Sequence, residues 1–187
     1  LIFHFVLSVV FVPYSLYGQE SAPKAVLIQL NSYKNKIDYY QRTGKEKNAI
    51  DLKKDVDSFA VALRKDFKER FDYCEVYYFY DSNLQKIKNK DLINTLYNAE
   101  GALLSQSPIP FNDSSYIITC LGFEAQKGRK GLIILDHNYK EIHLITKPEF
   151  AIFKSDSRSK YGGIEYYAFS TDLNNYLKQA DRKYERK

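Results

Sequence analysis

The chain opens with a stretch in which apolar positions dominate and charged side chains are missing. Residues 1–18 contain no Lys, Arg, Asp or Glu, and every charge of the chain lies after them. The apolar run is broken at Pro13, and the small residues Ser15 and Gly18 precede the polar segment that follows. This pattern is typical of a secretory signal peptide. The alternative is an uncleaved membrane anchor, but the run is shorter than the roughly 20 residues that a bilayer-spanning helix needs.

We therefore predict a signal peptide over residues 1–19 and a single globular domain over residues 20–187, either periplasmic or secreted. The domain is long enough to bury a hydrophobic core. No later stretch is apolar enough to predict a transmembrane helix. We expect no membrane span in the mature chain.

The first part of the domain alternates between an apolar run and helical periodicity. Residues 24–30 form a short apolar segment bounded by Pro23, which predicts a buried strand. A first helix is expected over residues 32–42 and ends before Gly44. The next helix is the clearest periodic signal, because its apolar residues recur at steps of three and four. These residues are Leu52, Val56, Phe59, Leu63, Phe67 and Phe71.

The middle of the chain predicts a second strand and then less regular structure. Residues 74–80 are apolar at nearly every position, which favours a central strand covered on both faces. Residues 81–83 are expected to cap a short helix. For residues 91–106 we favour a β-hairpin over a helix, because residues 98–101 carry a turn signal.

The last part predicts antiparallel strands and a terminal helix. Strands are expected over residues 115–123, 131–135 and 141–145, the last two joined as a hairpin, and another β-like run covers residues 164–169. Ser170 or Thr171 should cap the final helix.

These elements predict an α/β or α+β fold with a mixed central sheet. A helical hairpin between the first two strands implies that they are parallel and joined by a right-handed crossover. Later strands add antiparallel pairs at the edge, and a helix ends the chain. The order resembles the thioredoxin-like architecture. Where that fold places its Cys-x-x-Cys, however, this chain has Asn31-Ser32-Tyr33-Lys34, so the resemblance implies the fold without its usual redox chemistry.

A second resemblance rests on three segments, residues 72–79, 129–134 and 163–169. On these, the chain from residue 24 to about residue 178 resembles an uncharacterised family of exported proteins from Bacteroidota-type bacteria. That family has no assigned activity. The resemblance therefore implies an exported location, and it implies no role for any residue.

Composition narrows the classes of partner. Lys and Arg exceed Asp and Glu by only 5, and the two signs are interspersed along the chain. Nucleic-acid binding needs a concentrated basic face, so we expect no nucleic acid as a partner. The chain has 17 Tyr and 12 Phe but no Trp, so tyrosine should supply much of the aromatic packing.

The two cysteines leave three interpretations open. In an exported protein Cys74 and Cys120 could form one disulfide. Each lies in an apolar β-like run, where it could instead be a buried free thiol. A redox role is the third option, although the pair lacks the Cys-x-x-Cys spacing of oxidoreductases.

The most suggestive polar segment is the loop over residues 122–131. Lys127, Arg129 and Lys130 lie among three glycines there, so cations and backbone N–H groups could contact an anion or a partner. The loop lacks the spacing of a P-loop, and a plain exposed connection is the alternative. His137 and His143 do not predict a converging ligand set, so we expect no metal and no cofactor.

Together these patterns predict an exported soluble domain that binds a ligand without catalysis, and we lean against an enzyme. The partner would be an envelope protein, a glycan or an anionic ligand. One alternative is a thioredoxin-like thiol enzyme using Cys74 or Cys120. The other is a structural or assembly protein that oligomerises through the Leu52–Phe71 helix.

Overall fold

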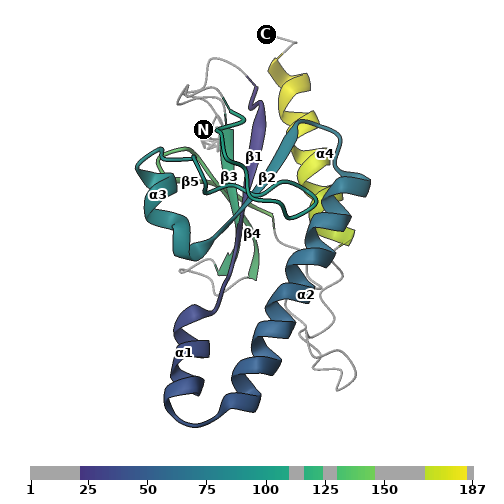
Figure 1. The fold of residues 1–187 in the computed structure, drawn as a ribbon. Helices are drawn as coiled ribbons and strands as arrows, with labels where there is room; N and C mark the ends of the chain where they lie inside the picture. Colours follow the sequence, from purple (N-terminus) through teal and green to yellow (C-terminus); the bar gives the residue numbers. More distant parts are fainter. Residues whose placement is uncertain (1–21, 110–115, 124–129, 146–166, 185–187) are drawn as a thin grey trace, which may run out of the picture.

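The computed structural model of the chain describes residues 22–109, 116–123, 130–145 and 167–184. Five strands, four α-helices and one 3₁₀ turn lie within these residues. In chain order they are β1 (Ala25–Leu30), α1 (Lys34–Arg42), α2 (Glu46–Arg70), β2 (Glu75–Tyr80), η1 (Asp81–Asn83), α3 (Leu84–Lys88), β3 (Tyr116–Phe123), β4 (Lys130–Leu135), β5 (Glu141–Ile145) and α4 (Tyr167–Tyr184). Figure 1 shows their arrangement.

The strands form one mixed sheet in the order β2-β1-β3-β4-β5. Strand β1 pairs in parallel with β2 and also with β3, whereas β4 and β5 continue the sheet with antiparallel pairs. Helices α1 and α2 form the crossover between β1 and β2. The predicted mixed sheet, helical hairpin crossover and C-terminal helix are therefore confirmed.

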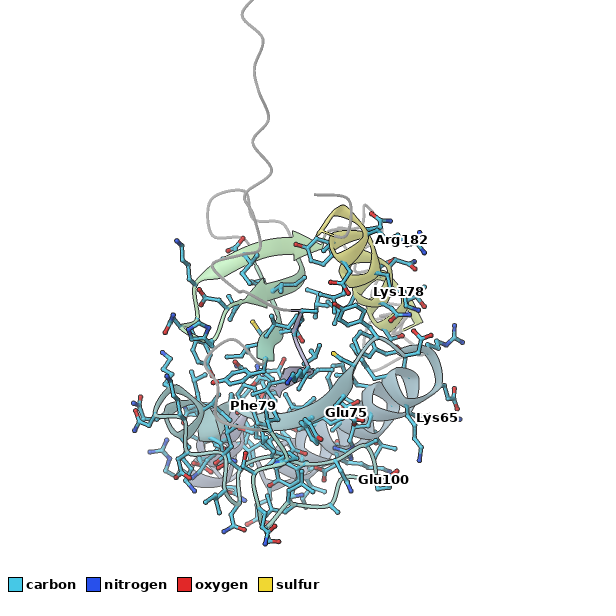
Figure 2. All side chains as sticks on the ribbon, turned by 90° about the horizontal axis from the view of Figure 1, so that it is seen from above. Lys65, Glu75, Phe79, Glu100, Lys178 and Arg182 are labelled. Carbon is cyan, nitrogen blue, oxygen red and sulfur yellow. The ribbon has the colours of Figure 1, made fainter. Side chains whose placement is uncertain are left out.

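Helices cover both faces of the sheet because its central strands are apolar on both sides. From β1, Val26 and Ile28 pack in the cluster that contains residues of α2 and α4. The alternate residue Leu27 packs in the opposite cluster, with residues of α3 and of the segment that follows it. Figure 2 shows Phe79 of β2 in the interior, and Lys178 and Arg182 on the outer side of α4.

Helix α1 and the first turns of α2 extend beyond the carboxyl end of β1, away from the sheet, and the rest of α2 runs back beside the sheet (Figure 1). Helix α1 contains no buried residue. By contrast, α2 buries Val56, Leu63 and Phe67 in the core of the same chain. This packing does not favour oligomerisation through the predicted apolar stripe, because that stripe already has a partner within the molecule.

Strand β2 lies at one edge of the sheet, so the prediction that it is a central strand is wrong. Its outward edge is partly covered by the segment after α3. The Tyr78 N–H donates to the Tyr97 carbonyl at 2.9 Å, and the Tyr97 N–H donates to the Tyr78 carbonyl at 2.8 Å. Both faces of β2 also pack against core clusters. Strand β2 is therefore as apolar as a central strand, because both of its faces are packed and a loop covers part of its edge.

The segment 91–106 is neither a helix nor a regular hairpin. A turn at residues 98–101 brings Tyr97 opposite Leu103 in a single antiparallel bridge. The Gly101 N–H donates to the Asn98 carbonyl at 3.0 Å, and Gly101 has φ +82°. The predicted turn is therefore confirmed, whereas the two strands of the predicted hairpin are not formed.

Two predicted helix caps are wrong. The N-cap of α3 makes no hydrogen bond through its side chain, and Asp81 instead accepts bonds from the turn after β1. Helix α4 begins at Tyr167, so Ser170 lies inside it rather than at its start. The predicted β-like run 164–169 is for the same reason helical from Tyr167 onward.

The predicted signal peptide over residues 1–19 lies outside the described residues. Within the part of the chain that the structure describes, no helix combines the length and the apolar character needed to cross a bilayer.

Candidate functional site

The residues predicted to contact an anion are not brought into a described site. Lys127 and Arg129 lie outside the described residues. Lys130 is the first residue of β4, where its backbone pairs with Phe123 at the end of β3.

The two cysteines are separate thiols in the structure. Cys74 immediately precedes Glu75, which pairs with Ala25, whereas Cys120 pairs with Gln29 further along the same central strand. Five strand positions correspond to roughly 16 Å at about 3.3 Å per residue. A disulfide needs Cα atoms within about 7 Å of each other, so this placement favours two thiols.

Neither thiol has the environment of a nucleophile. Burial, together with the nearby Glu75 and Asp181 carboxylates, raises the pKa of Cys74 to about 12. Burial and the Glu141 carboxylate raise the pKa of Cys120 as well. A reactive cysteine requires a lowered pKa. These surroundings therefore favour buried thiols over a thiol enzyme.

A different pocket lies where β1 and β2 end side by side. Leu30 pairs with Tyr80, so the turns that follow the two parallel strands meet at the carboxyl edge of the sheet. Ligands of α/β proteins commonly bind at this edge. The hollow there has a volume of ≈ 350 Å³. Its lining, which we call the carboxyl-edge site, consists of Asn31, Ser32, Tyr33, Lys34, Asn35, Lys36, Asp81 and Ser82.

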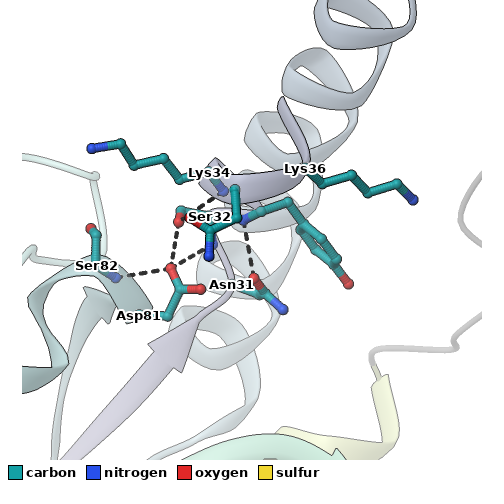
Figure 3. A pocket seen from close by; sticks show the side chains of 8 residues that line it. Asn31, Ser32, Lys34, Lys36, Asp81 and Ser82 are labelled. Atoms are coloured by element: carbon teal, nitrogen blue, oxygen red, sulfur yellow. Dashed lines mark hydrogen bonds between the residues drawn. The ribbon is translucent and has the colours of Figure 1, made fainter. Parts of the chain in front are cut away.

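Asp81 is fixed in the carboxyl-edge site through one of its two carboxylate oxygens (Figure 3). Its Oδ1 accepts the backbone N–H of Ser32 at 2.9 Å and the Ser32 hydroxyl at 2.5 Å. It also accepts the backbone N–H of Ser82 at 2.9 Å. Among the described residues, no hydrogen bond reaches the other oxygen, Oδ2. The site therefore presents one carboxylate oxygen that is held in place and open to a ligand.

Tyr33 lies in the left-handed region of backbone conformation, with φ 49° and ψ 25°. This conformation costs an L-residue about 1–2 kcal/mol. Two contacts hold it: the Asn31 Oδ1 accepts the Tyr33 N–H at 3.0 Å, and the Tyr33 carbonyl accepts the N–H groups of Lys36 and Ile37. The Tyr33 side chain is 45% exposed. Strained residues cluster at functional sites, so the position of this tyrosine supports a binding role.

Two cations flank the carboxyl-edge site. In Figure 3 the side chains of Lys34 and Lys36 extend in opposite directions from the start of α1. Within the described residues neither ammonium has a carboxylate partner, although Lys36 lies 5.8 Å from the centre of the Tyr40 ring. Two lysines against one aspartate leave the site with a positive charge.

A larger hollow, of ≈ 800 Å³, lies near the opposite, amino end of β1 and β2. Phe67 and Phe71 line it, and so do Lys68 and Asp72. These polar groups are already paired, because Lys68 binds Glu100 at 2.7 Å and Asp72 binds Lys178 at 2.5 Å. A ligand there would have to displace internal contacts, whereas the carboxyl-edge site offers free donors and acceptors. We therefore regard the carboxyl-edge site as the candidate functional site.

The described residues contain no group of three or more His, Cys, Asp or Glu side chains placed to hold a metal ion. His137 lies in the turn before β5, and its Nε2 is 2.9 Å from the Asn138 amide nitrogen.

The carboxyl-edge site was not predicted from the sequence. Ser32 and Asp81 are 49 positions apart, and each looks like an ordinary turn residue. A signal was nevertheless present. Asp81 directly follows β2, and Ser32 comes two residues after the end of β1. The two strands were predicted to be parallel neighbours, and the carboxyl ends of such strands meet.

Comparisons of the chain with protein-family models, with curated proteins and with solved structures found no match. The geometry of the described residues is therefore the basis for assigning a function.

Proposed function

We propose that this protein is an exported, non-catalytic binding domain whose carboxyl-edge site holds a negatively charged saccharide. The observation that carries the proposal is the clamped Asp81 carboxylate with its open Oδ2. The uncharged, apolar pattern of residues 1–18 supports export. The resemblance to exported proteins, noted on residues 72–79, 129–134 and 163–169, agrees with this location.

The polar groups of the site suit a ligand that both donates and accepts hydrogen bonds. Asp81 Oδ2 can accept a hydrogen bond from a hydroxyl group of the ligand. The Asn31 Oδ1 is already bonded to Tyr33, so the Asn31 amide nitrogen remains as a donor, together with the Lys34 ammonium. The exposed face of the Tyr33 ring can pack on the apolar face of a sugar ring. A few fixed polar groups beside an aromatic surface are what a small-ligand site requires.

The net positive charge of the site favours an acidic sugar, such as a uronate, over a neutral one. The Ser32 hydroxyl donates to a carboxylate oxygen of Asp81 and not to an imidazole or an amine. A serine nucleophile needs an adjacent group that can take its proton near neutral pH. This arrangement supports binding rather than nucleophilic catalysis.

The test is titration calorimetry with disaccharides that contain glucuronate, galacturonate or mannuronate, each beside its neutral counterpart. We expect binding of at least one uronate disaccharide, more tightly than its neutral counterpart. Asp81→Asn should weaken that binding about tenfold or more, because hydrogen bonds to a charged group contribute about 1.5–3 kcal/mol. The matched control is Asp91→Asn, at an exposed position outside the site. Failure of every disaccharide to bind at millimolar concentration would contradict the proposal.

Tyr33→Gly separates binding from stability. Glycine adopts the backbone conformation of Tyr33 without strain, so the free energy of unfolding should rise by about 1 kcal/mol. Affinity for the sugar should fall, because the ring is lost. Denaturant unfolding and calorimetry on the same variant measure the two effects. A variant that is both more stable and unchanged in affinity would show that Tyr33 plays no part in binding.

A further inference from the structure

The carboxyl-edge site continues into an exposed row of side chains along α1. Lys36 and Tyr40 are four positions apart in α1, so they lie on one side of the helix, and Tyr33 immediately precedes the first residue of α1. The Lys36 ammonium lies 5.8 Å from the centre of the Tyr40 ring. The Tyr39 ring lies beside it, with 6.0 Å between the centres of the Tyr39 and Tyr40 rings. Helix α1 thus carries a row of aromatic and cationic groups that starts at the pocket.

Most of the row is open to solvent, because Tyr33, Lys36 and Tyr39 are exposed and Tyr40 is half-buried. Helix α1 has no buried residue, and the Tyr39 side chain is 51% exposed. In Figure 1 α1 lies away from the sheet, at the end of the hairpin, with α2 beside it. A ligand that extends from the carboxyl-edge site in this direction would contact these side chains.

The charges of the row suit an anion. Lys34, Lys36 and Arg42 make no ion pair with any described residue, and Asp38 is the single acid in α1. The Arg42 Nε donates only to the Asp38 backbone carbonyl, at 3.3 Å. The positive charge near the pocket therefore extends along the helix. Unpaired cations of this kind attract a chain of negative charges.

The spacing suits a repeating ligand. Seven residues separate Tyr33 from Tyr40, which corresponds to about 10 Å along a helix that rises 1.5 Å per residue. This is comparable to the length of a disaccharide unit in an extended polysaccharide. A sugar held in the carboxyl-edge site would have its following units beside Lys36 and over Tyr40.

We propose that the natural ligand is an extended acidic polysaccharide, held at one sugar by the carboxyl-edge site and along the next units by α1. This inference rests on the proposed function and adds that the ligand is a polymer that follows the helix. Tyrosine rings pack on successive sugars, and Lys36 binds a carboxylate between them. Each contact is weak alone, and several on one polymer raise the affinity together.

The test is the dependence of affinity on chain length, measured by calorimetry with uronate oligosaccharides from dimer to octamer. We expect the octamer to bind at least tenfold more tightly than the dimer. The advantage should decrease as salt concentration rises. Tyr39→Ala should remove several-fold of the octamer's advantage and leave dimer affinity nearly unchanged, because Tyr39 lies outside the carboxyl-edge site. Lys36→Gln should weaken the binding of both dimer and octamer, and of the octamer more, because Lys36 also lines that site. Lys86→Gln, an exposed lysine on α3, is the matched control.

Three results separate this inference from the proposed function. Equal affinity for dimer and octamer would overturn the inference and leave the proposed function standing. Binding of no oligosaccharide of any length would overturn both. Lys36-dependent sedimentation with anionic phospholipid vesicles, without octamer binding, would show that α1 meets a membrane and would also overturn both.

Discussion

At the scale of single residues, two glycines show how much backbone conformation alone decides. Gly44 has φ +69° and Gly101 has φ +82°, values that L-residues rarely adopt. A Cβ atom at Gly44 would have no neighbour within 4 Å, whereas at Gly101 it would lie 3.0 Å from the Arg64 Nη2. The two positions therefore share the strain and differ in crowding.

We expect Gly44→Ala to lower the free energy of unfolding by about 1–2 kcal/mol through the backbone alone. Gly101→Ala should cost more, because the Arg64 guanidinium must also move. Urea unfolding of the two variants measures the difference. If Gly101→Ala unfolds at the same urea concentration as the unchanged protein, the turn does not have the conformation described.

The cysteines allow a second prediction at this scale. Burial raises the pKa of both Cys74 and Cys120, so little thiolate forms near neutral pH. In the native protein both should react slowly with an aromatic disulfide reagent, and two thiols should be counted after denaturation without reductant. A rapid reaction of one native thiol would revive the alternative of a thiol enzyme. A count of zero in the denatured protein would instead show a disulfide.

At the scale of elements, the packing of α4 on α2 depends on polar groups with opposite pH behaviour. Asp66 of α2 is buried, with its Oδ1 3.3 Å from the Arg70 Nε. Burial raises its pKa, and the nearby Ser170 offsets part of that rise. Asp72 lies just after α2, and its carboxylate accepts hydrogen bonds from the side chains of Asn174 and Lys178 of α4. These two bonds lower the pKa of Asp72.

Replacing Asp66 should reveal the cost of a buried charge. Because the folded pKa of Asp66 lies above its ordinary value near 3.8, the unchanged protein loses stability as pH rises from that value through the folded pKa. Asp66→Asn cannot ionise, so its stability relative to the unchanged protein should increase over the same range. Denaturant unfolding at pH 3.5 and pH 7 tests this. A larger gain at pH 3.5 than at pH 7 would contradict it.

Replacing Asp72 should have the reverse pH dependence. Its folded pKa is lowered, so its contribution is present above its ordinary value near 3.8 and is lost as pH falls through the folded pKa. Asp72→Asn should therefore destabilise the protein at pH 7 and lose most of that effect in strong acid. The same unfolding series measures it, with Asp91→Asn as a control for the removal of one surface charge. An effect of Asp72→Asn that does not change with pH would exclude the Lys178 ion pair as its source.

Elements were predicted well where the signal is local. The apolar steps of α2 and the short run of β1 follow from neighbouring residues, and both elements appear where expected. The position of β2 in the sheet is not local, because it depends on β3 pairing with the far side of β1. The start of α4 also escaped prediction, since Tyr167 belongs to a β-like aromatic run.

At the scale of the whole molecule, stability should be distributed unevenly. Strands β1 and β3 lie inside the sheet and carry almost fully buried residues such as Val26, Leu27 and Ile118. Helix α1 buries none. Hydrogen exchange followed by mass spectrometry should show slow exchange in peptides from β1 and β3, and much faster exchange in α1 and the first turns of α2. Equal protection of α1 and β1 would mean that the hairpin tip is covered.

The candidate site was also beyond local patterns. The bonds between Ser32 and Asp81 exist because Leu30 and Tyr80 pair in register, and register depends on the whole sheet. A contact with an anion or a partner was predicted at Lys127, Arg129 and Lys130 because their charges lie close together in the sequence. Composition identifies residues that are close together in the sequence, whereas the residues of this site are far apart in the sequence and come together in the fold.

The pairing of Tyr97 with β2 has a consequence for behaviour in crowded solution. An uncovered strand offers its amides and carbonyls as a template on which a second molecule can start a shared, growing fibre. Here the backbone of Tyr97 already binds the N–H and the carbonyl of Tyr78, near the middle of the outer edge of β2. The aromatic outer edge of β2 is thereby partly protected from fibril growth, in a protein with seventeen tyrosines.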